Sequence, residues 1–366
     1  MEYKNNDVNV LFIPFGSGQA AATRYRVSQY LPYLSKTGIR HKVFSSISEW
    51  TTKQMIQSPN FKGIRKSIYY LHVVLERIFR FYPILFLATR YKIVFLQRTT
   101  FPFGLERLLK RVNKNIIFDI DDSIYMPDAE ESGLIGVVKK YIKRKEVISI
   151  LKVSQCAIVE NNHIKKFVKK YCDQIYIITG PIDTARNYAR RDNSNPDELT
   201  IGWIGSPSTT LYLKMLDGVL QQLSKRYKIK LRLIGATFYA IEGVKVEVVN
   251  WKEKTEILEL HKFDIGIMPM PDNEWTRGKV GCKMLQYMAN AIPAVVSHTP
   301  TNAEIIKDGI NGFLVNSEEE WIEKISLLIN NPGLRCKIGI AGRKTVEERF
   351  SLDVSSPKFL EILRDL

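Results

Sequence analysis

The stretch from Phe263 to Val315 constrains the fold of this chain more than any other segment. It predicts a buried strand ending at Pro269, a polar loop, a helix that starts within residues 278–282 and runs to Ala291, and a second strand over residues 294–297. A strand, a helix and a strand in this order form a βαβ unit, which requires a parallel sheet. The helix start carries unpaired N–H groups and about half a positive charge, so it suits a phosphate or diphosphate.

Apolar strands alternate with helices along the rest of the chain, which predicts parallel α/β sheets covered on both faces. The predicted strands lie over residues 8–15, 41–45, 93–97, 116–120, 157–160, 175–178 and 199–204. One helix is predicted to carry Arg24, Arg26, Tyr30 and Leu34, and another to run from Thr209 to Ser224. The chain has 366 residues, which exceeds the roughly 250–300 residues at which a single core stops growing. The sequence therefore predicts two domains, and its apolar content of 45% is enough for two cores.

The boundary between the domains is predicted from a change in composition. Residues 186–198 lack the apolar periodicity of a packed element and are rich in charged residues and asparagine. We predict an N-terminal domain over residues 1–185, a linker over 186–198 and a second domain over 199–348.

Several kinds of site are not indicated by the sequence. The four cysteines (Cys156, Cys172, Cys282, Cys336) form no CxxC pair, which argues against a zinc site or a disulfide framework. The histidines show no HExxH spacing, so no metal site is expected among them. No glycine-rich loop ends in GK[ST], which argues against hydrolysis of a nucleoside triphosphate, and no cofactor is expected. The first ten residues contain acidic and polar side chains where a signal peptide would be apolar, so we expect a cytoplasmic protein.

Positive charge is concentrated in the N-terminal half of the chain. Residues 1–180 contain 29 Lys and Arg against 14 Asp and Glu, a net charge of +15, whereas residues 181–366 contain 25 against 24. Such asymmetry indicates an anionic partner, which includes nucleic acid, an acidic membrane surface or a phosphate-bearing substrate. A solvated basic face without a partner is the alternative.

The segment from Ile64 to Arg90 favours the membrane among these partners. It sets arginines and a lysine among aromatic and aliphatic residues, and its longest apolar run has eight residues, Phe81–Ala88. Crossing a bilayer needs about 20, so the segment is expected to lie in the headgroup region of an anionic surface. A core helix is the alternative. No recognised nucleic-acid-binding motif accompanies the charge, so we do not expect nucleic acid as a partner.

Two runs of residues, GKVGCKMLQYMANAIPAVVS from Gly278 and NAEIIKDGINGFLV from Asn302, resemble the nucleotide-sugar-binding half of GT-B glycosyltransferases of the family 4-like group. The resemblance implies two Rossmann-like domains that face each other across a cleft, with residues 349–366 forming a helix that packs back on the first domain. It implies a retaining, metal-independent enzyme that moves a sugar from a nucleotide diphosphate sugar onto a glycan or lipid-linked acceptor. Biosynthesis of surface polysaccharide or glycoconjugate is the setting it suggests.

Lys279 and Lys283 flank the predicted helix start and are the candidate catalytic residues of the second domain. Negative charge grows on the nucleoside diphosphate as it leaves, and cationic groups held in place would stabilise it. Solvated helix lysines are the alternative for both. The resemblance implies further donor-binding residues, which are Gly205, Ser206, Met268, Gly278, Gly281, Cys282, Gln286 and Glu304.

The chain departs from the resembled family at two positions. Many family members carry two glutamates eight residues apart, one on the donor sugar and one on the ribose, and here Gly278 and Gln286 occupy those positions. A glutamine amide can still hydrogen-bond ribose hydroxyls, but Gly278 offers no side chain. Either a backbone N–H, Arg277 or Glu274 contacts the sugar, or the protein binds its donor without turning it over. A non-catalytic nucleotide-sugar-binding protein and a GT-B nucleotide-sugar epimerase therefore remain as alternatives.

The acidic cluster of Asp119, Asp121 and Asp122 follows the strand over residues 116–120. An Asp-x-Asp pair can hold a divalent ion, but that motif belongs to a one-domain glycosyltransferase architecture. We expect Asp121 to face the cleft and act as a base or orient an acceptor hydroxyl. Capping of the next helix or pairing with Arg98 is the alternative.

The acceptor is expected near the loop after the first strand, because that loop approaches acceptor and donor phosphate in the resembled fold. A planar guanidinium suits an acceptor phosphate, and outward salt-bridging helix arginines are the alternative. His163 is a further candidate, although a lone histidine is more often structural. The predicted acceptor-binding residues are Gly16, Ser17, Gly18, Arg24, Arg26 and Asp122.

Overall fold

The computed structural model of the protein describes residues 8–57, 61, 63–126, 134–189, 197–236 and 238–366. The chain forms two compact units. The first unit comprises the residues up to Pro181 together with Gly278–Val280 and Ser355–Leu366, and the second comprises Ile182–Arg277 and Gly281–Val354. Residues 190–196 of the predicted linker lie outside the described residues.

The first unit is built on a six-stranded parallel sheet in its described part, with the order β2-β1-β3-β4-β5-β6. The predicted strands over residues 93–97 and 116–120 are confirmed to the residue, and the others lie within two residues of their predicted bounds. β3 and β4 are buried along their whole length because helices cover both faces of the sheet. The strands are β1 (Asn9–Pro14), β2 (Arg40–Val43), β3 (Ile93–Gln97), β4 (Ile116–Ile120), β5 (Cys156–Val159) and β6 (Ile175–Ile177).

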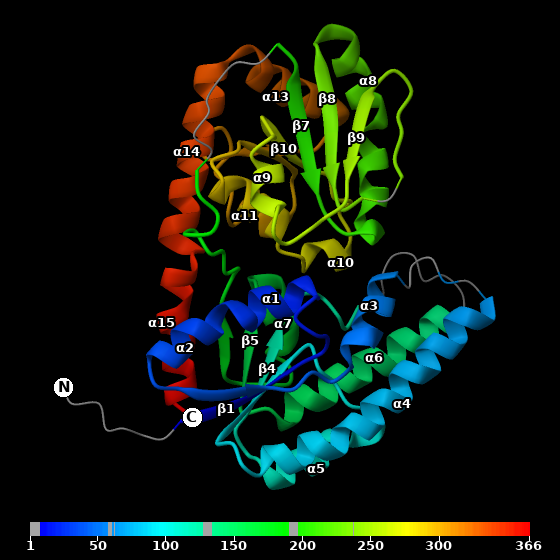
Figure 1. Ribbon diagram of the computed structural model, residues 1–366, viewed down its shortest axis with the longest axis vertical. Helices are drawn as coiled ribbons and strands as arrows, with labels where there is room; N and C mark the ends of the chain where they lie inside the picture. Colours follow the sequence, from blue (N-terminus) through cyan, green and yellow to red (C-terminus); the bar gives the residue numbers. More distant parts are fainter. Residues whose placement is uncertain (1–7, 58–60, 62, 127–133, 190–196, 237) are drawn as a thin grey trace, which may run out of the picture. The chain divides into compact units, whose positions relative to one another are not determined.

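Helices connect these strands, and α4 is the longest of those described in this unit (Figure 1). The single helix predicted to carry Arg24 through Leu34 is wrong, since Val27 leaves the helical region at φ −129°. A new helix begins at Leu31, with Pro32, which has no N–H to donate, in its first turn. The helices are α1 (Ala21–Arg26), η1 (Ser28–Tyr30), α2 (Leu31–Lys36), α3 (Glu49–Gln57), α4 (Gly63–Ala88), η3 (Pro102–Gly104), α5 (Glu106–Val112), α6 (Leu134–Val153) and α7 (Asn162–Val168).

The last helix, α15 (Leu352–Arg364), contributes residues from Ser355 onward to the first unit. Its Phe359 is buried and its ring centroid lies 4.4 Å from that of Tyr30, 5.4 Å from that of Phe95 and 6.3 Å from that of Phe12. Aromatic packing of this kind adds stability beyond the buried area, so the end of the chain completes the core of the first unit.

The second unit holds another six-stranded parallel sheet among its described residues, in the order β12-β11-β10-β7-β8-β9. The strands predicted over residues 199–204 and 294–297 are confirmed to the residue. The strands are β7 (Leu199–Ile204), β8 (Ile229–Ile234), β9 (Lys245–Val249), β10 (Ile265–Met268), β11 (Ala294–Ser297) and β12 (Phe313–Val315).

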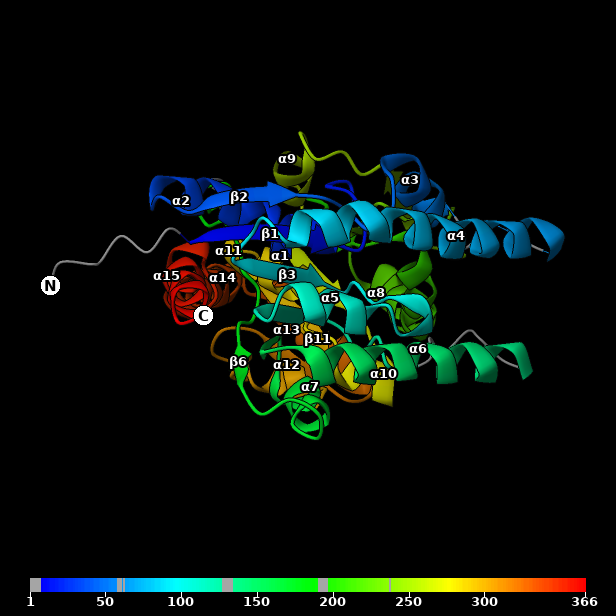
Figure 2. The ribbon, with the colours of Figure 1, turned by 90° about the horizontal axis from the view of Figure 1, so that it is seen from below.

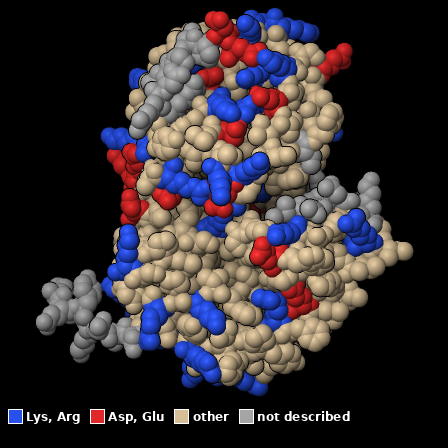
Figure 3. Space-filling model, in the orientation of Figure 1, with Lys and Arg blue, Asp and Glu red and all other residues tan. Residues whose placement is uncertain are grey.

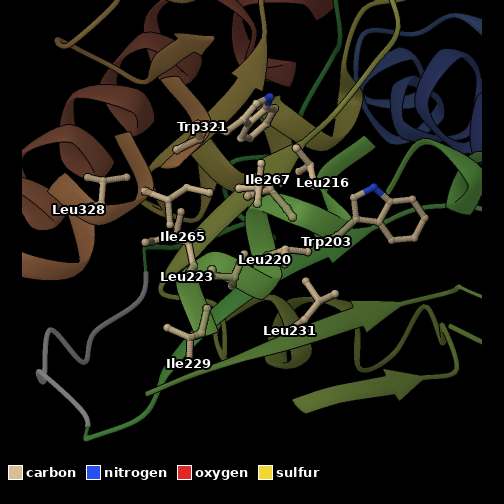
Figure 4. Packing of buried hydrophobic residues seen from close by; sticks show 14 of the residues in the cluster. Trp203, Leu216, Leu220, Leu223, Ile229, Leu231, Ile265, Ile267, Trp321 and Leu328 are labelled. Atoms are coloured by element: carbon tan, nitrogen blue, oxygen red, sulfur yellow. The ribbon is translucent and has the colours of Figure 1, made fainter. Parts of the chain in front are cut away.

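The core of the second unit lies between this sheet and helices that include α8 (Asp217–Arg226) and α13 (Glu318–Asn330) (Figure 4). Trp203 of β7, Ile265 and Ile267 of β10, and Trp321 of α13 are all at most 5% exposed. The helix predicted from Thr209 to Ser224 is instead a 3₁₀ segment, η4 (Pro207–Leu216), followed by α8 (Asp217–Arg226). The remaining helices are α9 (Glu256–Leu260), α10 (Glu274–Arg277), α11 (Cys282–Ala289), α12 (Pro300–Ala303), α13 (Glu318–Asn330) and α14 (Pro332–Arg349).

Candidate functional site

The strand order of the second unit marks one place on its sheet for a ligand. From the adjacent strands β7 and β10 the chain proceeds in opposite directions, to β8 and β9 on one side and to β11 and β12 on the other. Connections that leave in opposite directions open a crevice at the carboxyl ends of the two strands, and ligands of open α/β sheets bind there. We call the residues gathered at this edge, Trp203, Gly205, Thr209, Met268 and Lys283, the β7–β10 site.

Tyr287 of α11 separates the ends of these two strands. The ladder between β7 and β10 stops at the pair Gly202 and Gly266. Beyond it the Tyr287 hydroxyl accepts a hydrogen bond from the Ile204 N–H (3.1 Å) and donates one to the Ile267 carbonyl (3.2 Å). Burial raises the pKa of Tyr287 above its usual value, so the hydroxyl keeps the proton that it donates.

Two paired glycines allow aromatic rings to lie directly on the sheet. A Cβ at Gly202 would overlap the ring of Phe263, and one at Gly266 would overlap the ring of Tyr287. A backbone without side chains thus brings α11 close to β10. The first turn of α11 is thereby held against the carboxyl end of the strand.

Lys283 projects from the first turn of α11 onto the end of β7. Its Nζ lies 4.1 Å from the centroid of the Trp203 ring and donates a hydrogen bond to Thr209 Oγ1 (2.9 Å). A Cβ at Gly205 would collide with both the Lys283 ammonium and the Trp203 ring. The indole face and a bare backbone therefore position a cation at the carboxyl edge of the sheet.

The start of α11 adds further positive potential to the β7–β10 site. Gly281 is the N-cap residue and makes no side-chain cap hydrogen bond, and the first turn contains no acidic residue. A Cβ at Gly281 would collide with the thioether of buried Met268, so the helix start packs tightly on β10. A lysine near the positive end of a helix is unfavourable by itself. A bound anion would offset this repulsion, so the arrangement is complementary to an anion. Cys282, the first helical residue, is half-buried.

Ser206 and Gly235 shape the loops beside this cation. Ser206 is exposed, its hydroxyl lies 3.0 Å from that of Ser208, and its carbonyl accepts a hydrogen bond from the Thr209 N–H (3.0 Å). Gly235 has a φ of +79°, and a Cβ there would collide with the Gly205 carbonyl. The loops after β7 and β8 can touch only because a glycine stands at this position.

Gln286 lies in the interior of the second unit. Its side chain is 6% exposed, and its Nε2 donates a hydrogen bond to a carboxylate oxygen of Glu256, at the start of α9. Glu256 is equally buried. Gln286 stands where many members of the resembled family have a glutamate. The structure thus places a carboxylate beside this position, but it belongs to Glu256 of α9.

Three further donor candidates are Gly278, Lys279 and Glu304. Gly278 and Lys279 precede α11 and belong to the first unit, where Gly278 is buried and Lys279 half-buried. Glu304 follows α12 and is exposed, and its carbonyl accepts a hydrogen bond from Arg349 (3.2 Å). Lys283, Gly205 and Met268 therefore belong to the second unit, whereas Lys279 belongs to the first.

In the first unit, the loop after β1 lies at the corresponding switch point, between β1 and β3. Gly16 is buried, and the Ser17 N–H donates a hydrogen bond to Thr52 Oγ1 (3.0 Å). Gly18 is exposed and has open space around it, and Arg24 is half-buried. The loop is thus anchored at its start and open at Gly18.

Arg26 lies in the interior of the first unit. It is 3% exposed and forms an ion pair with Asp119, which is 1% exposed. Its Nη1 also donates hydrogen bonds to the carbonyls of Ile178 (2.7 Å) and Gly180 (2.9 Å). All of these contacts are internal, so the acceptor role predicted for Arg26 finds no support in this geometry.

Asp121 and Asp122 both form ion pairs with Arg98. The predicted alternative, pairing with Arg98, is therefore confirmed. Arg98 adopts a left-handed backbone conformation (φ 52°), which is strained for a residue with a side chain. Within the described part of the chain, no group of three or more His, Cys, Asp or Glu is arranged to hold a metal ion. His163 is the second residue of α7 and is half-buried.

Glu160, at the end of β5, is a buried carboxyl group beside this cluster that the sequence analysis did not select. It is 3% exposed, and burial raises its pKa well above the usual range, against the opposing effect of Arg26. Burial likewise raises the pKa of Asp119 to about 6. The folded protein therefore holds protons here that an unfolded chain releases near pH 4.

This shift predicts a pH dependence of stability. A raised carboxyl pKa stabilises the fold below the unfolded pKa, and that stabilisation is lost as the pH rises through the folded pKa. Glu160→Gln should thus become more stable relative to the wild type as the pH rises, by up to about 1.4 kcal/mol per pH unit. Urea unfolding of both proteins at several pH values above about 4, the ordinary carboxyl pKa, measures this difference. A difference independent of pH would show that Glu160 has an ordinary pKa.

Comparison with known proteins gives the family of one part of the chain, most of which lies in the second unit. Residues 198–331 match the family described as glycosyl transferases group 1. This part of the chain is a group 1 glycosyltransferase domain. No curated protein matches the sequence significantly.

Solved structures show that the group 1 domain and the first unit together have the GT-B fold. HepE from Anabaena, in complex with UDP and glucose, matches with a TM-score of 0.68 at 13% identity over 98% of this chain and 99% of HepE. Sucrose-phosphate synthase from Thermosynechococcus elongatus matches with a TM-score of 0.72 at 12% identity over 98% of each chain. TarM matches with a TM-score of 0.57 at 17% identity, and the chain covers 54% of TarM. The predicted GT-B fold is confirmed.

The group 1 domain contains the whole β7–β10 site, since residues 203 to 283 fall within the matched range. The sequence analysis missed four contributors to its geometry: Trp203, Thr209, Gly235 and Glu256. Trp203 appears only as one apolar residue of a buried strand, and Glu256 as one charge in a polar loop. A glycine directly after β8 was the one available signal, because a strand that ends in glycine often leads into a tight loop.

Proposed function

We propose that this protein transfers a sugar from a nucleoside diphosphate sugar to a glycan or a lipid-linked acceptor. The observation that carries the proposal is Lys283, which is held between Trp203 and Thr209 at the start of α11. It lies at the switch point of a sheet that belongs to a group 1 glycosyltransferase domain. The UDP and glucose in the HepE structure support a donor of this class.

The proposed reaction requires this site to stabilise negative charge on the leaving group. The bond between the anomeric carbon and a diphosphate oxygen breaks, and its electrons stay on the leaving nucleoside diphosphate. Lys283 and the N–H groups at the start of α11 would offset this charge without reorganising during the reaction. Gly205 and Ser206 would border the diphosphate, and Gln286 with Glu256 would take the ribose. Gly278, Lys279 and Glu304 are proposed nearer the donor sugar.

The finer description of the reaction is also a proposal. Retention of configuration and independence from metal follow from the resemblance at residues 278–297 and 302–315. We assign the acceptor to the first unit, at the loop from Gly16 to Gly18 with Arg24. Asp121 and Asp122 would orient an acceptor hydroxyl from their pairing with Arg98. Surface polysaccharide or glycoconjugate biosynthesis at the cytoplasmic face of a membrane is the proposed setting.

Donor binding is the first test. The purified protein is heated with UDP-, GDP-, dTDP- and CMP-sugars in turn, and we expect one donor to raise the unfolding temperature by mass action. Lys283→Ala should lose most of that shift, whereas the exposed Lys225→Ala of α8 should keep it. The stabilising donor is then incubated with membrane lipid extract, and sugar should appear in the lipid fraction. No shift with any donor would contradict the proposal.

A non-catalytic nucleotide-sugar-binding protein is the second candidate, and Gly278 favours it because this position offers the donor sugar no side chain. That protein would be stabilised by a donor but would neither transfer the sugar nor slowly hydrolyse the donor. A nucleotide-sugar epimerase would convert the donor without any acceptor. Analysis of the sugar products with and without lipid extract distinguishes the three.

A further inference from the structure

The helix α4 carries an exposed apolar stripe along its whole length. Every residue of the stripe is between 44% and 79% exposed. At about 100° per residue, these positions fall within an arc of ~80° and extend over ~33 Å of the helix. We call this set the α4 stripe: Ile64, Ile68, Leu71, Leu75, Phe79, Tyr82 and Phe86.

The core of the first unit does not use this stripe. The residues of α4 that face the core, among them Phe81, Ile84 and Ala88, are at most 1% exposed and lie ~120–180° away from the centre of the stripe around the helix. Figures 1 and 2 show that the N-terminal half of α4 extends past the edge of its sheet. The predicted alternative that these apolar residues form only core is therefore wrong for the stripe.

The charged groups exposed near the α4 stripe include two arginines. The Arg90 guanidinium lies 4.3 Å from the ring centroid of Phe86, and exposed Arg65 lies 4.3 Å from that of Phe61. The acidic residue of α4, Glu76, turns inward and accepts hydrogen bonds from the Ser48 N–H (2.6 Å) and from a threonine hydroxyl. The surface over α4 in Figure 3 is mostly neither acidic nor basic, with separate charged groups.

Aromatic residues make this face suited to a lipid headgroup region. Phe79, Tyr82 and Phe86 belong to the stripe, and Trp50 of α3 is 59% exposed and packs edge-on against His72 of α4. Trp and Tyr, such as Trp50 and Tyr82, concentrate at membrane–water interfaces, and Phe side chains are typical of the apolar face of helices that lie in the interface. Among the described helices, none is long and apolar enough to cross a membrane, so α4 would lie flat.

We propose that the α4 stripe docks on an anionic lipid surface, with its apolar side chains among the upper acyl chains and Arg65 and Arg90 at the lipid phosphates. A second copy of the chain fits less well. Antiparallel pairing of two stripes would place Arg65 of one helix beside Arg90 of the other, and parallel pairing would oppose identical cations. The lipid contact does not depend on the transfer reaction, whereas a lipid-linked acceptor at this surface rests on the proposed function.

Sedimentation with vesicles tests the docking. The full chain should co-sediment with phosphatidylglycerol–phosphatidylcholine vesicles at low salt, and poorly with phosphatidylcholine vesicles or at high salt. Leu71→Gln with Phe79→Gln should weaken binding about tenfold or more. The matched control, Leu258→Gln with Phe238→Gln, alters exposed apolar residues of the second unit and should bind as the wild type does.

Three outcomes would overturn the docking: no binding to anionic vesicles at low salt, equal binding by the stripe variant, or a vesicle-free dimer that the stripe variant dissociates. The last would assign the stripe to self-association. Donor-induced stabilisation, measured without lipid, should be the same in the stripe variant and the wild type. Vesicle binding without any donor response would thus contradict the proposed function and leave the docking intact.

Discussion

Replacing Lys283 with alanine is expected to lower kcat/KM for sugar transfer by about 10²-fold or more, the usual cost of removing one group that stabilises developing negative charge. The ammonium lies 4.1 Å from the Trp203 ring centroid, at the start of α11. Its removal would leave the helix N–H groups as the remaining positive potential of the β7–β10 site. Initial rates with the donor found in the thermal screen measure the loss.

Two controls separate charge from packing in this experiment. Lys283→Arg keeps the cation over the indole face and should retain more activity than Lys283→Ala. Thr209→Val removes the hydroxyl that accepts the Lys283 hydrogen bond but leaves the charge, so its effect should be smaller. A loss below about threefold in Lys283→Ala, under ~1 kcal/mol, would exclude Lys283 from charge stabilisation.

Arg26→Met is expected to destabilise the protein by about 3–5 kcal/mol, because it leaves the Asp119 carboxylate buried without its partner. The carbonyls of Ile178 and Gly180 would also lose their donor. The loss should grow as the pH rises, since the variant raises the pKa of Asp119 further and a protonated carboxyl tolerates burial better. Urea unfolding at two pH values measures both effects.

The matched control is Arg24→Met, two residues earlier on α1, where the arginine is half-buried rather than buried and its Nη1 donates a hydrogen bond to the Gln19 carbonyl (3.4 Å). It should cost less than about 1 kcal/mol, as surface polar contacts usually do. Adding Asp119→Leu to Arg26→Met should recover part of the stability, because the uncompensated charge is then removed. Equal losses for Arg24→Met and Arg26→Met would show that the buried pair contributes little.

Much of the fold could be predicted because buried parallel strands are local signals. The strands over residues 93–97, 116–120, 199–204 and 294–297 are short, mostly apolar runs, and their bounds were correct. The helices after β1 and β7 were predicted less well. There, backbone geometry at Val27 and the 3₁₀ turns of η4 override the apolar period on which the prediction depended.

The candidate site divides in the same way. Lys283 could be selected from sequence because it lies in the βαβ unit, and a helix start in such a unit favours a phosphate. The partners that hold it could not be selected, since Trp203 and Thr209 lie at least 74 residues away in the chain. The ion pair of Arg26 could not be selected either, because its partner, Asp119, is 93 residues distant in the chain.

The sequence by itself determined the class of this protein: two parallel α/β sheets, a phosphate-suited helix start and a basic first half. These properties depend on residue type and on the spacing of apolar residues over short stretches, and both are visible in the sequence. Only the tertiary structure decided which charges are internal and which face outward. Burial, hydrogen-bond partners and the direction of each helix face are long-range properties, and they placed Arg26 in the interior, Lys283 over an indole and the α4 stripe at the surface.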